Sequence, residues 1–369
     1  MNALPESAMT FGAPGLYVQG PGMLDHLEPL LNGLGKRPMV LLSKSQMGAL
    51  RGQLERSLGA LAEHAHFELF PGECTARAIA VAAQAGRDKG CDLIVGIGGG
   101  KTIDAAKGAQ ILLNVPLAIV PSIASNDAPT SRLVVLYDEN HVLSGTRLMK
   151  RSPDVVCVDT TLIANAPARF LLAGIGDAIS KKFEASQAVA AGGRNFFGGR
   201  GGQTALAIAD SCYRTLCNDG PAAMQAAQRR QPDAAFERLV EACVLGSGLG
   251  FESGGLSIAH SLLRGLTTIP SLGNALHGEL VAVSLLTQLC ASSMPEAQIV
   301  ELLQLYQRIG LPSTFEALGL TEVLDEVARR VAQTTVATSP YVGNFEIKVT
   351  EQVLSDAMLR ADRLARSVQ

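Results

Sequence analysis

Three residues far apart in the sequence, Asp177, His260 and His277, are of the types that hold a catalytic metal ion. Asp177 lies in LLAGIGDAISKKFEA (171–185), after a Gly-Ile-Gly segment that we interpret as a turn at the start of a helix. His260 lies in an apolar helical pattern, and His277 opens another helix. One carboxylate and two imidazoles match the ligand count of a zinc site that keeps a position open for substrate. Taken singly, each histidine fits a packed core or helix-cap residue equally well.

Two further segments follow predicted strands and have the composition of ligand-binding loops. GIGGGKTIDAAKG (96–108) leaves a strand and opens a helix, so backbone N–H groups and the helix dipole can face a pyrophosphate. Its spacing is neither G-x-G-x-x-G nor a Walker loop, and a tight strand-to-helix turn explains it as well. VPSIASNDAPTS (120–131) places Asp127 where it can contact substrate, or where it caps the following turn.

The elements that must position these residues fall into two parts. Short apolar runs alternate with helical patterns up to about residue 159, which predicts a parallel sheet covered by helices. After that point helical spacing dominates. We therefore expect an α/β, Rossmann-like N-terminal domain (1–162) and an all-helical C-terminal domain (163–369). Strands are expected at 38–42, 66–69, 92–97, 116–120, 133–137, 141–143 and 155–158, and helices of the second part include 161–190, 204–216, 222–249, 256–266 and 278–290.

The composition argues against several classes of protein. A net charge of −3 gives no polyanion-binding signature, so we expect no nucleic-acid partner. The seven cysteines contain no C-x-x-C pair, which argues against a disulfide framework and a structural zinc cluster. We see neither a secretory signal nor an apolar run long enough to span a bilayer, so we expect no membrane association and a cytoplasmic location.

Together these segments resemble the glycerol dehydrogenase branch of the metal-dependent, iron-type (group III) alcohol dehydrogenases. The resemblance covers nearly the whole chain and implies a dehydroquinate-synthase-like fold with the active site in the cleft between the two domains. It also implies a homo-oligomer. The segments that carry it are YVQG (17–20), GGGKTIDAAK (98–107), VPSIASNDAP (120–129), SPDVVCVDT (152–160), APARFLLAGIGDA (166–178), GGRGGQTALAIADSCYRTL (198–216), SGLGFESGGLSIAH (247–260) and LHGELVA (276–282).

The resemblance implies a role for each matching position. Asp177, His260 and His277 would hold the metal, and Asp127 would contact substrate hydroxyls. We count His277 and, although it departs from the family pattern, Lys181 with Asp127 as candidate catalytic residues. The ligand set suits zinc; iron members carry another His four residues after the Asp, where this chain has Lys181, and iron or another divalent ion is the alternative. NAD or NADP would be lined by Gly98, Gly99, Gly100, Lys101, Ser43, Ser122, Ser125, Ser131, Leu133 and Tyr137.

The implied reaction is hydride transfer between an alcohol or polyol and its ketone or aldehyde. The metal lowers the pKa of the alcohol, and the nicotinamide accepts the hydride. Two other classes stay open at this point. A sugar-phosphate cyclase of the dehydroquinate synthase type would return the hydride within one cycle and show no net cofactor reduction. A non-catalytic nucleotide-binding relative would have no reason to keep three metal ligands together.

Departures from the family pattern raise two questions of specificity. Lys181 and Arg264 lie within a helical turn of metal ligands, so the substrate could carry a carboxylate or phosphate. Alternatively, these side chains extend to solvent or pair with an acid such as Glu184. Ser43 and Lys44 stand where NAD-specific relatives carry an acidic residue. The change would allow NADP, or it marks a plain solvent-facing turn.

Overall fold

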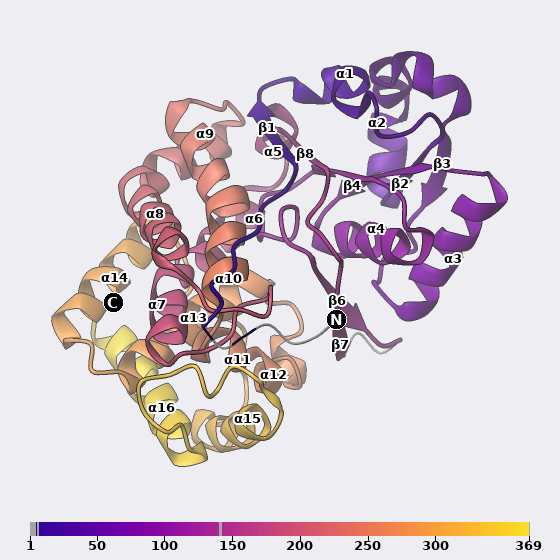
Figure 1. The fold of residues 1–369 in the computed structure, drawn as a ribbon. Helices are drawn as coiled ribbons and strands as arrows, with labels where there is room; N and C mark the ends of the chain where they lie inside the picture. Colours follow the sequence, from indigo (N-terminus) through magenta and orange to yellow (C-terminus); the bar gives the residue numbers. More distant parts are fainter. Residues whose placement is uncertain (1–4, 6, 140–141, 369) are drawn as a thin grey trace.

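The computed structural model describes residues 5, 7–139 and 142–368, and it has an α/β part followed by a helical part (Figure 1). The first part is built on a six-stranded sheet, and nearly all of the regular structure after it is helical. The predicted fold class is therefore confirmed.

The six strands are all parallel and follow the order β1-β8-β5-β4-β2-β3. The sequence pattern misses only β1, an edge strand that stays partly exposed and so lacks a buried apolar run. β6 and β7 form a separate antiparallel hairpin. Of the strand predicted at 141–143, His141 lies outside the described residues, and β7 begins only at Leu143 and extends to Leu148. The bounds are β1 Leu16–Gly20, β2 Pro38–Leu42, β3 His66–Leu69, β4 Leu93–Gly98, β5 Leu117–Pro121, β6 Leu133–Tyr137, β7 Leu143–Leu148 and β8 Val155–Asp159.

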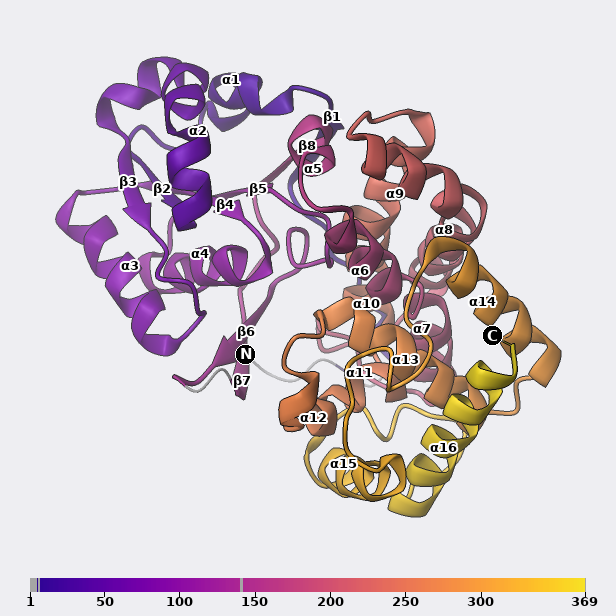
Figure 2. The same cartoon turned by 180° about the vertical axis from the view of Figure 1, so that it is seen from behind.

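Helices cover both faces of this sheet because its strands are apolar on both sides (Figures 1 and 2). In β2, Met39 and Leu41 pack in one core with α3 (Ala76–Asp88) and α4 (Gly100–Leu113). Val40 and Leu42 point the other way, into a core with α1 (Leu27–Leu31) and α2 (Lys44–Ser57). The sheet is thus the middle of three layers, and its strand ends are left free for a site.

The helical part is arranged around α13, in which every residue from 278 to 290 is buried. α6 and α16 pack against it. Among the described residues no helix is both long enough and apolar enough to cross a membrane. The helices of this part are α5 Thr160–Ala164, α6 Ala168–Ala178, α7 Lys181–Ala190, α8 Gln203–Arg229, α9 Ala234–Glu241, α10 Ser247–Gly254, α11 Ile258–Ser261, α12 Leu263–Leu266, α13 His277–Ala291, α14 Glu296–Ile309, α15 Leu324–Thr338 and α16 Glu351–Val368.

The glycines before Asp177 do not form the turn that the sequence suggests. Gly174 and Gly176 lie inside α6, and Asp177 is near the end of that helix rather than its start. They are there because neighbouring backbone is too close for a side chain. A Cβ on Gly174 would lie 1.9 Å from the carbonyl oxygen of Ala124, and one on Gly176 would lie 2.3 Å from that of Gly278. The predicted turn was wrong: Gly174 instead lets the loop after β5 approach α6 closely, and Gly176 does the same for α13.

Helix boundaries in the second part also differ from the prediction. α8 runs through Pro221, where the sequence pattern predicts a break. A proline removes only one helical N–H donor, and the buried face of α8 continues on both sides of it. The helix ends at Arg230, in the left-handed conformation (φ 55°), and Asp233 caps α9. The helix predicted at 256–266 is divided into the short α11 and α12.

Candidate active site

A cavity of about 720 Å³ lies where the carboxyl ends of β2, β4 and β5 face the helices of the second part. Most of the residues predicted for the site line it, and they come from both parts of the chain. Gly98, Ser122 and Asp177 do not line it, because they are buried directly behind its wall. The predicted residues that line it are Ser43, Gly99, Gly100, Lys101, Ser125, Asp127, Ser131, Leu133, Tyr137, Lys181, His260 and His277.

The sheet topology forms the nucleotide side of this cavity. β2 and β4 are neighbours, but the chain leaves β2 towards β3 and leaves β4 towards β5, on the opposite side. Loops that diverge in this way open a crevice at the strand ends, where open α/β sheets bind ligands. Gly99 caps α4, and a Cβ on Gly100 would lie 2.8 Å from Asn126 Nδ2. The first turn of α4 can therefore present its N–H groups to a phosphate.

A buried ion pair holds the opposite wall of the crevice, and the sequence analysis missed it. Lys107 Nζ donates to Leu133 O (2.8 Å) and Ser131 Oγ (3.2 Å) and pairs with Asp104 Oδ1 (3.3 Å). Asp104 Oδ2 accepts from the N–H of Val135 (3.0 Å). Both charged residues therefore fix the start of β6. In the sequence, Asp104 and Lys107 stand among small and apolar residues of one helix, and this setting was the available signal for a buried ion pair.

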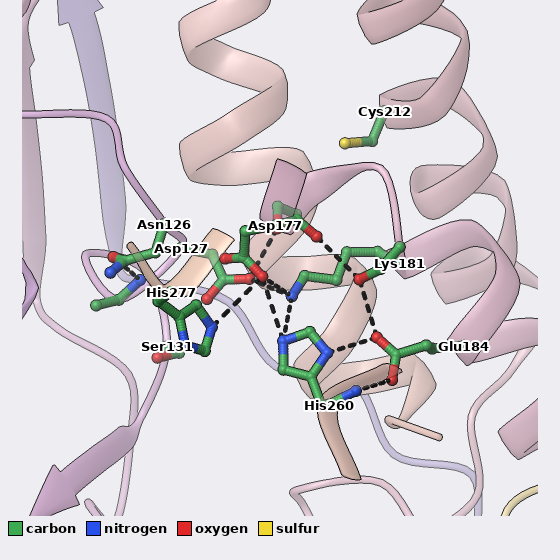
Figure 3. A network of polar contacts seen from close by, with 12 residues as sticks. Asn126, Asp127, Ser131, Asp177, Lys181, Glu184, Cys212, His260 and His277 are labelled. Carbon is green, nitrogen blue, oxygen red and sulfur yellow. Dashed lines mark hydrogen bonds and ion pairs between the residues drawn. The ribbon is translucent and has the colours of Figure 1, made fainter. Parts of the chain in front are cut away.

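On the helical side, Asp177, His260 and His277 are brought together from α6, α11 and α13 (Figure 3). Asp177 Oδ1 is 3.2 Å from His260 Nε2 and 3.7 Å from His277 Nε2, and one ligand atom from each residue lies within 4.8 Å of the others. Tetrahedral zinc with bonds of about 2.1 Å separates its ligands by roughly 3.4 Å. Asp177 Oδ2 is buried and has no hydrogen-bond partner in the described chain. The three residues therefore fit a divalent metal ion.

Glu184 orients His260 for such a role. Its Oε2 is 2.5 Å from His260 Nδ1 and accepts from Ser180 Oγ (2.9 Å), while its Oε1 accepts the backbone N–H groups of Ser257 (2.9 Å) and His260 (3.0 Å). A carboxylate on Nδ1 leaves the Nε2 lone pair facing Asp177, as in many carboxylate–histidine–metal arrangements. The sequence analysis treated Glu184 only as a partner for Lys181. Its spacing of seven residues after Asp177 was the missed signal.

The position of His277 is fixed by the first turn of α13. Arg169 pairs with Glu279 through two contacts of 2.7 Å, and Glu279 Oε2 also accepts from the N–H of Leu276 (2.8 Å). Arg169 also donates to Asn274 O (3.0 Å). Such a bidentate pair fixes geometry as well as adding stability. The segment before α13 is therefore tied to α6, the helix that carries Asp177.

Lys181 lies among the three candidate metal ligands rather than in the open cavity. Its Nζ is 2.6 Å from Asp177 Oδ1, 3.1 Å from His260 Nε2 and 3.2 Å from Asp127 Oδ2. Burial alone would lower the pKa of Lys181, but Asp127, Asp177 and Glu184 outweigh it and raise that pKa above its ordinary value. For Asp177, burial is likewise outweighed, chiefly by Lys181, and the pKa is well below its ordinary value. Both groups are therefore charged.

Two other basic residues near the metal ligands in the sequence, Lys182 and Arg264, do not join this cluster. Lys182 pairs with Asp210 (2.9 Å) and lies over the ring of Tyr213. Arg264 does not line the cavity. Lys181 itself pairs with Asp177 and Asp127, not with Glu184.

Asp127 is held by α10 and by the segment before it. Its Oδ2 accepts from Ser247 Oγ (2.7 Å), and Thr130 donates to Val244 O (2.8 Å). Val244 belongs to a π-helical segment, Ala242–Gly246, an irregularity that is frequent at functional sites. The polar loop after β5 is therefore locked to the helical part, with Asp127 at the cavity wall.

A buried glutamate next to this loop predicts a pH dependence of stability. Glu252 accepts from the N–H of Arg132 (2.8 Å), and burial raises its pKa from 4.5 to about 7. The unfolded chain therefore loses this proton first, and the free energy of unfolding falls by about 3 kcal/mol as pH rises from 4.5 to 7. Glu252→Gln should remove this component. Urea unfolding measures the free energy of unfolding at pH 5 and pH 8, and the value for the variant relative to wild type should be higher at pH 8 than at pH 5. The same difference between the two proteins at both pH values would contradict the assignment.

Comparison with known proteins identifies the family. The profile of iron-containing alcohol dehydrogenases matches residues 14–160. Glycerol dehydrogenase from Escherichia coli O6:H1 is 38% identical over 357 residues, covering 95% of this chain and 96% of that protein. The enzyme of the same name from Thermotoga maritima is 38% identical over 354 residues, covering 96% of both chains. The chain belongs to the iron-containing alcohol dehydrogenase family.

A solved structure extends this similarity to the whole fold. A probable glycerol dehydrogenase from Sinorhizobium meliloti 1021 superposes with a TM-score of 0.93 at 35% identity, over 98% of this chain and all of that one. The resemblance to the glycerol dehydrogenase branch is thus confirmed, and the chain is an oxidoreductase of a family that uses a nicotinamide cofactor and a metal ion. Membership favours hydride transfer over the cyclase and non-catalytic hypotheses.

Proposed function

We propose that this iron-type alcohol dehydrogenase interconverts a glycerol-like polyol and its carbonyl product, with zinc held by Asp177, His260 and His277. The observation that carries the proposal is the convergence of these three residues beside the crevice at the ends of β2 and β4. Relatives named glycerol dehydrogenase along nearly the full chain support a polyol as substrate.

The metal supplies Lewis acidity that lowers the pKa of an alcohol, and the nicotinamide supplies the hydride acceptor. The chain's own residues position the two reactants. Glu184 keeps His260 Nε2 directed at the metal site, and the N-terminal N–H groups of α4 would hold the cofactor's phosphates. Asp127 Oδ2 is engaged by Ser247 and Lys181, so its Oδ1 is the oxygen that we assign to a substrate hydroxyl.

Contacts of Lys181 favour a neutral substrate over an acidic one. An ammonium has three N–H donors, and Asp177, His260 and Asp127 take all three. With a metal on Asp177 and His260, Lys181 can still pair with Asp127, so a carboxylate of the chain balances its charge in both states and a substrate carboxylate or phosphate is not required. We therefore propose glycerol and related diols as substrates, and we keep glycerol phosphate and hydroxy acids as the alternative substrate class.

Cofactor reduction at 340 nm tests the function directly. The purified enzyme should reduce NAD or NADP with glycerol or 1,2-propanediol in the presence of zinc, and a chelator should remove the activity. Faster turnover of acidic analogues would move the assignment to that class. No net reduction with any alcohol would reject the dehydrogenase. Parallel reconstitution with zinc and ferrous iron compares the two metals.

The turn after β2 predicts that NADP is accepted. Ser43 caps α2 and lines the cavity, and Lys44 beside it is exposed. No acidic side chain stands at this position to repel a 2′-phosphate. Lys44→Glu should lower the NADP-to-NAD ratio of kcat/KM about tenfold, since an attractive charge is replaced by a repulsive one. Steady-state kinetics with both cofactors measures the ratio. Lys36→Glu, before the amino end of β2 and outside the cavity, is the control. A strong NAD preference in wild type would refute this prediction.

We also propose that the protein is a cytoplasmic homo-oligomer whose two parts divide near residues 162–163, within α5. The family resemblance supports the first two statements. Light scattering coupled to size-exclusion chromatography tests the assembly, cell fractionation tests the location, and limited proteolysis tests the division.

A further inference from the structure

Lys181 shares its contacts with the proposed metal. Its Nζ lies 2.6 Å from Asp177 Oδ1 and 3.1 Å from His260 Nε2, the same atoms that face His277 at the centre of the ligand set (Figure 3). The side chain is 1% exposed, so the ammonium is part of the site and not a solvent-facing group.

We propose that the Lys181 ammonium and a divalent metal compete for this site, so that Lys181 is the internal counter-ion of the metal-free enzyme and weakens metal binding. The proposal rests on the proposed function only in taking Asp177, His260 and His277 as the metal ligands.

The chemistry of His260 makes the two states mutually exclusive. A neutral imidazole nitrogen that is not protonated has a single lone pair. Glu184 at 2.5 Å commits Nδ1 as the donor, so Nε2 is the one acceptor left on the ring. That lone pair can accept from Lys181 or bind a metal, but not both. Binding of a metal therefore requires that Nζ leave His260.

The charges around Lys181 explain why the metal-free state can be stable. Asp177 and Glu184 are almost completely buried, and Asp127 is nearly so. Buried carboxylates without a cation are strongly destabilising. Lys181, the first residue of α7 and four positions after Asp177, supplies that cation from within the chain.

The displaced ammonium has a second partner already in place. Asp127 Oδ2 lies 3.2 Å from Nζ and borders the cavity. The lysine side chain has a flexible four-carbon stem. Nζ can therefore withdraw from His260 and Asp177 while it keeps its ion pair with Asp127, which leaves the ligand atoms to the metal.

Zinc affinity of Lys181 variants tests the competition. Lys181→Gln and Lys181→Met should each lower the zinc Kd at least tenfold, measured against a chromophoric chelator and checked by metal analysis after dialysis. Lys182→Gln, one position along and paired with Asp210 on the surface, is the matched control and should leave the Kd within twofold of wild type. An unchanged or higher Kd in both Lys181 variants would overturn the proposal.

Thermal stability gives a readout independent of activity. Without metal, both Lys181 variants should melt at lower temperature than wild type, and zinc should raise their Tm by more than it raises that of wild type. Equal zinc shifts in all proteins would overturn the competition. Should wild type bind no zinc while Lys181→Gln binds it, the competition stands and the zinc-dependent function fails. Should no variant bind zinc, both fail.

Discussion

Replacing Asp177 with Asn is expected to lower kcat by at least about a thousandfold, while the protein still folds and binds its nicotinamide cofactor. Asp177 Oδ1 is the atom that both histidines face, at 3.2 and 3.7 Å. An amide oxygen binds a metal more weakly than a carboxylate, and loss of the Lewis acid removes several kcal/mol of transition-state stabilisation. About 4 kcal/mol corresponds to a thousandfold in rate.

Initial rates at saturating zinc, with cofactor binding followed by fluorescence, separate this effect from a general loss of structure. The metal ligands come from α6, α11 and α13 and not from the strand ends that face the cofactor, so the cofactor Kd should change by less than threefold. Asp210→Asn, which removes an exposed partner of Lys182, controls for the change of side chain. A kcat for Asp177→Asn within tenfold of wild type would mean that the metal assignment is wrong.

Most strands can be predicted from the sequence because the pattern that marks each of them lies within a few consecutive residues. Strands such as Pro38–Leu42 and Leu133–Tyr137 have the predicted bounds, since a run of apolar residues between polar turns is visible in the sequence itself. Gly174 and Gly176 were misinterpreted for the same reason. A glycine pair is typical of a turn, and only the packing of α6 against the loop after β5 and against α13 reveals that both glycines are required for close contact.

Residue types and the family resemblance selected Asp177, His260 and His277, but not the contacts that orient them. The pairs Glu184–His260 and Arg169–Glu279 join residues 76 and 110 positions apart. Spacing along a single helix carries no information about such pairs. Lys181 illustrates the same limit: the sequence placed it within a turn of Asp177, but the contact of its Nζ with His260 depends on how α11 packs against α7.

Replacing Gly278 with Ala is expected to destabilise the protein by about 3 kcal/mol or more, or to prevent folding. A Cβ at this position would lie 1.7 Å from the carbonyl oxygen of Ala173 and 2.6 Å from its carbonyl carbon. Both atoms belong to the backbone of α6, so no side-chain rotation can relieve the clash. α6 and α13 would have to separate, and Asp177 and His277 would move apart with them. Activity should therefore fall together with stability.

Gly48 provides the matched control, because Gly48→Ala changes the helix propensity in the same way without creating a clash. It lies exposed within α2, and a Cβ there would meet no atom within 4 Å. Gly48→Ala should raise stability by about 0.5–1 kcal/mol, because alanine favours the helix. Urea unfolding of both variants measures the contrast. A Gly278→Ala protein as stable as wild type would show that the two helices are not in backbone contact, and the proposed alignment of Asp177 with His277 would lose its structural basis.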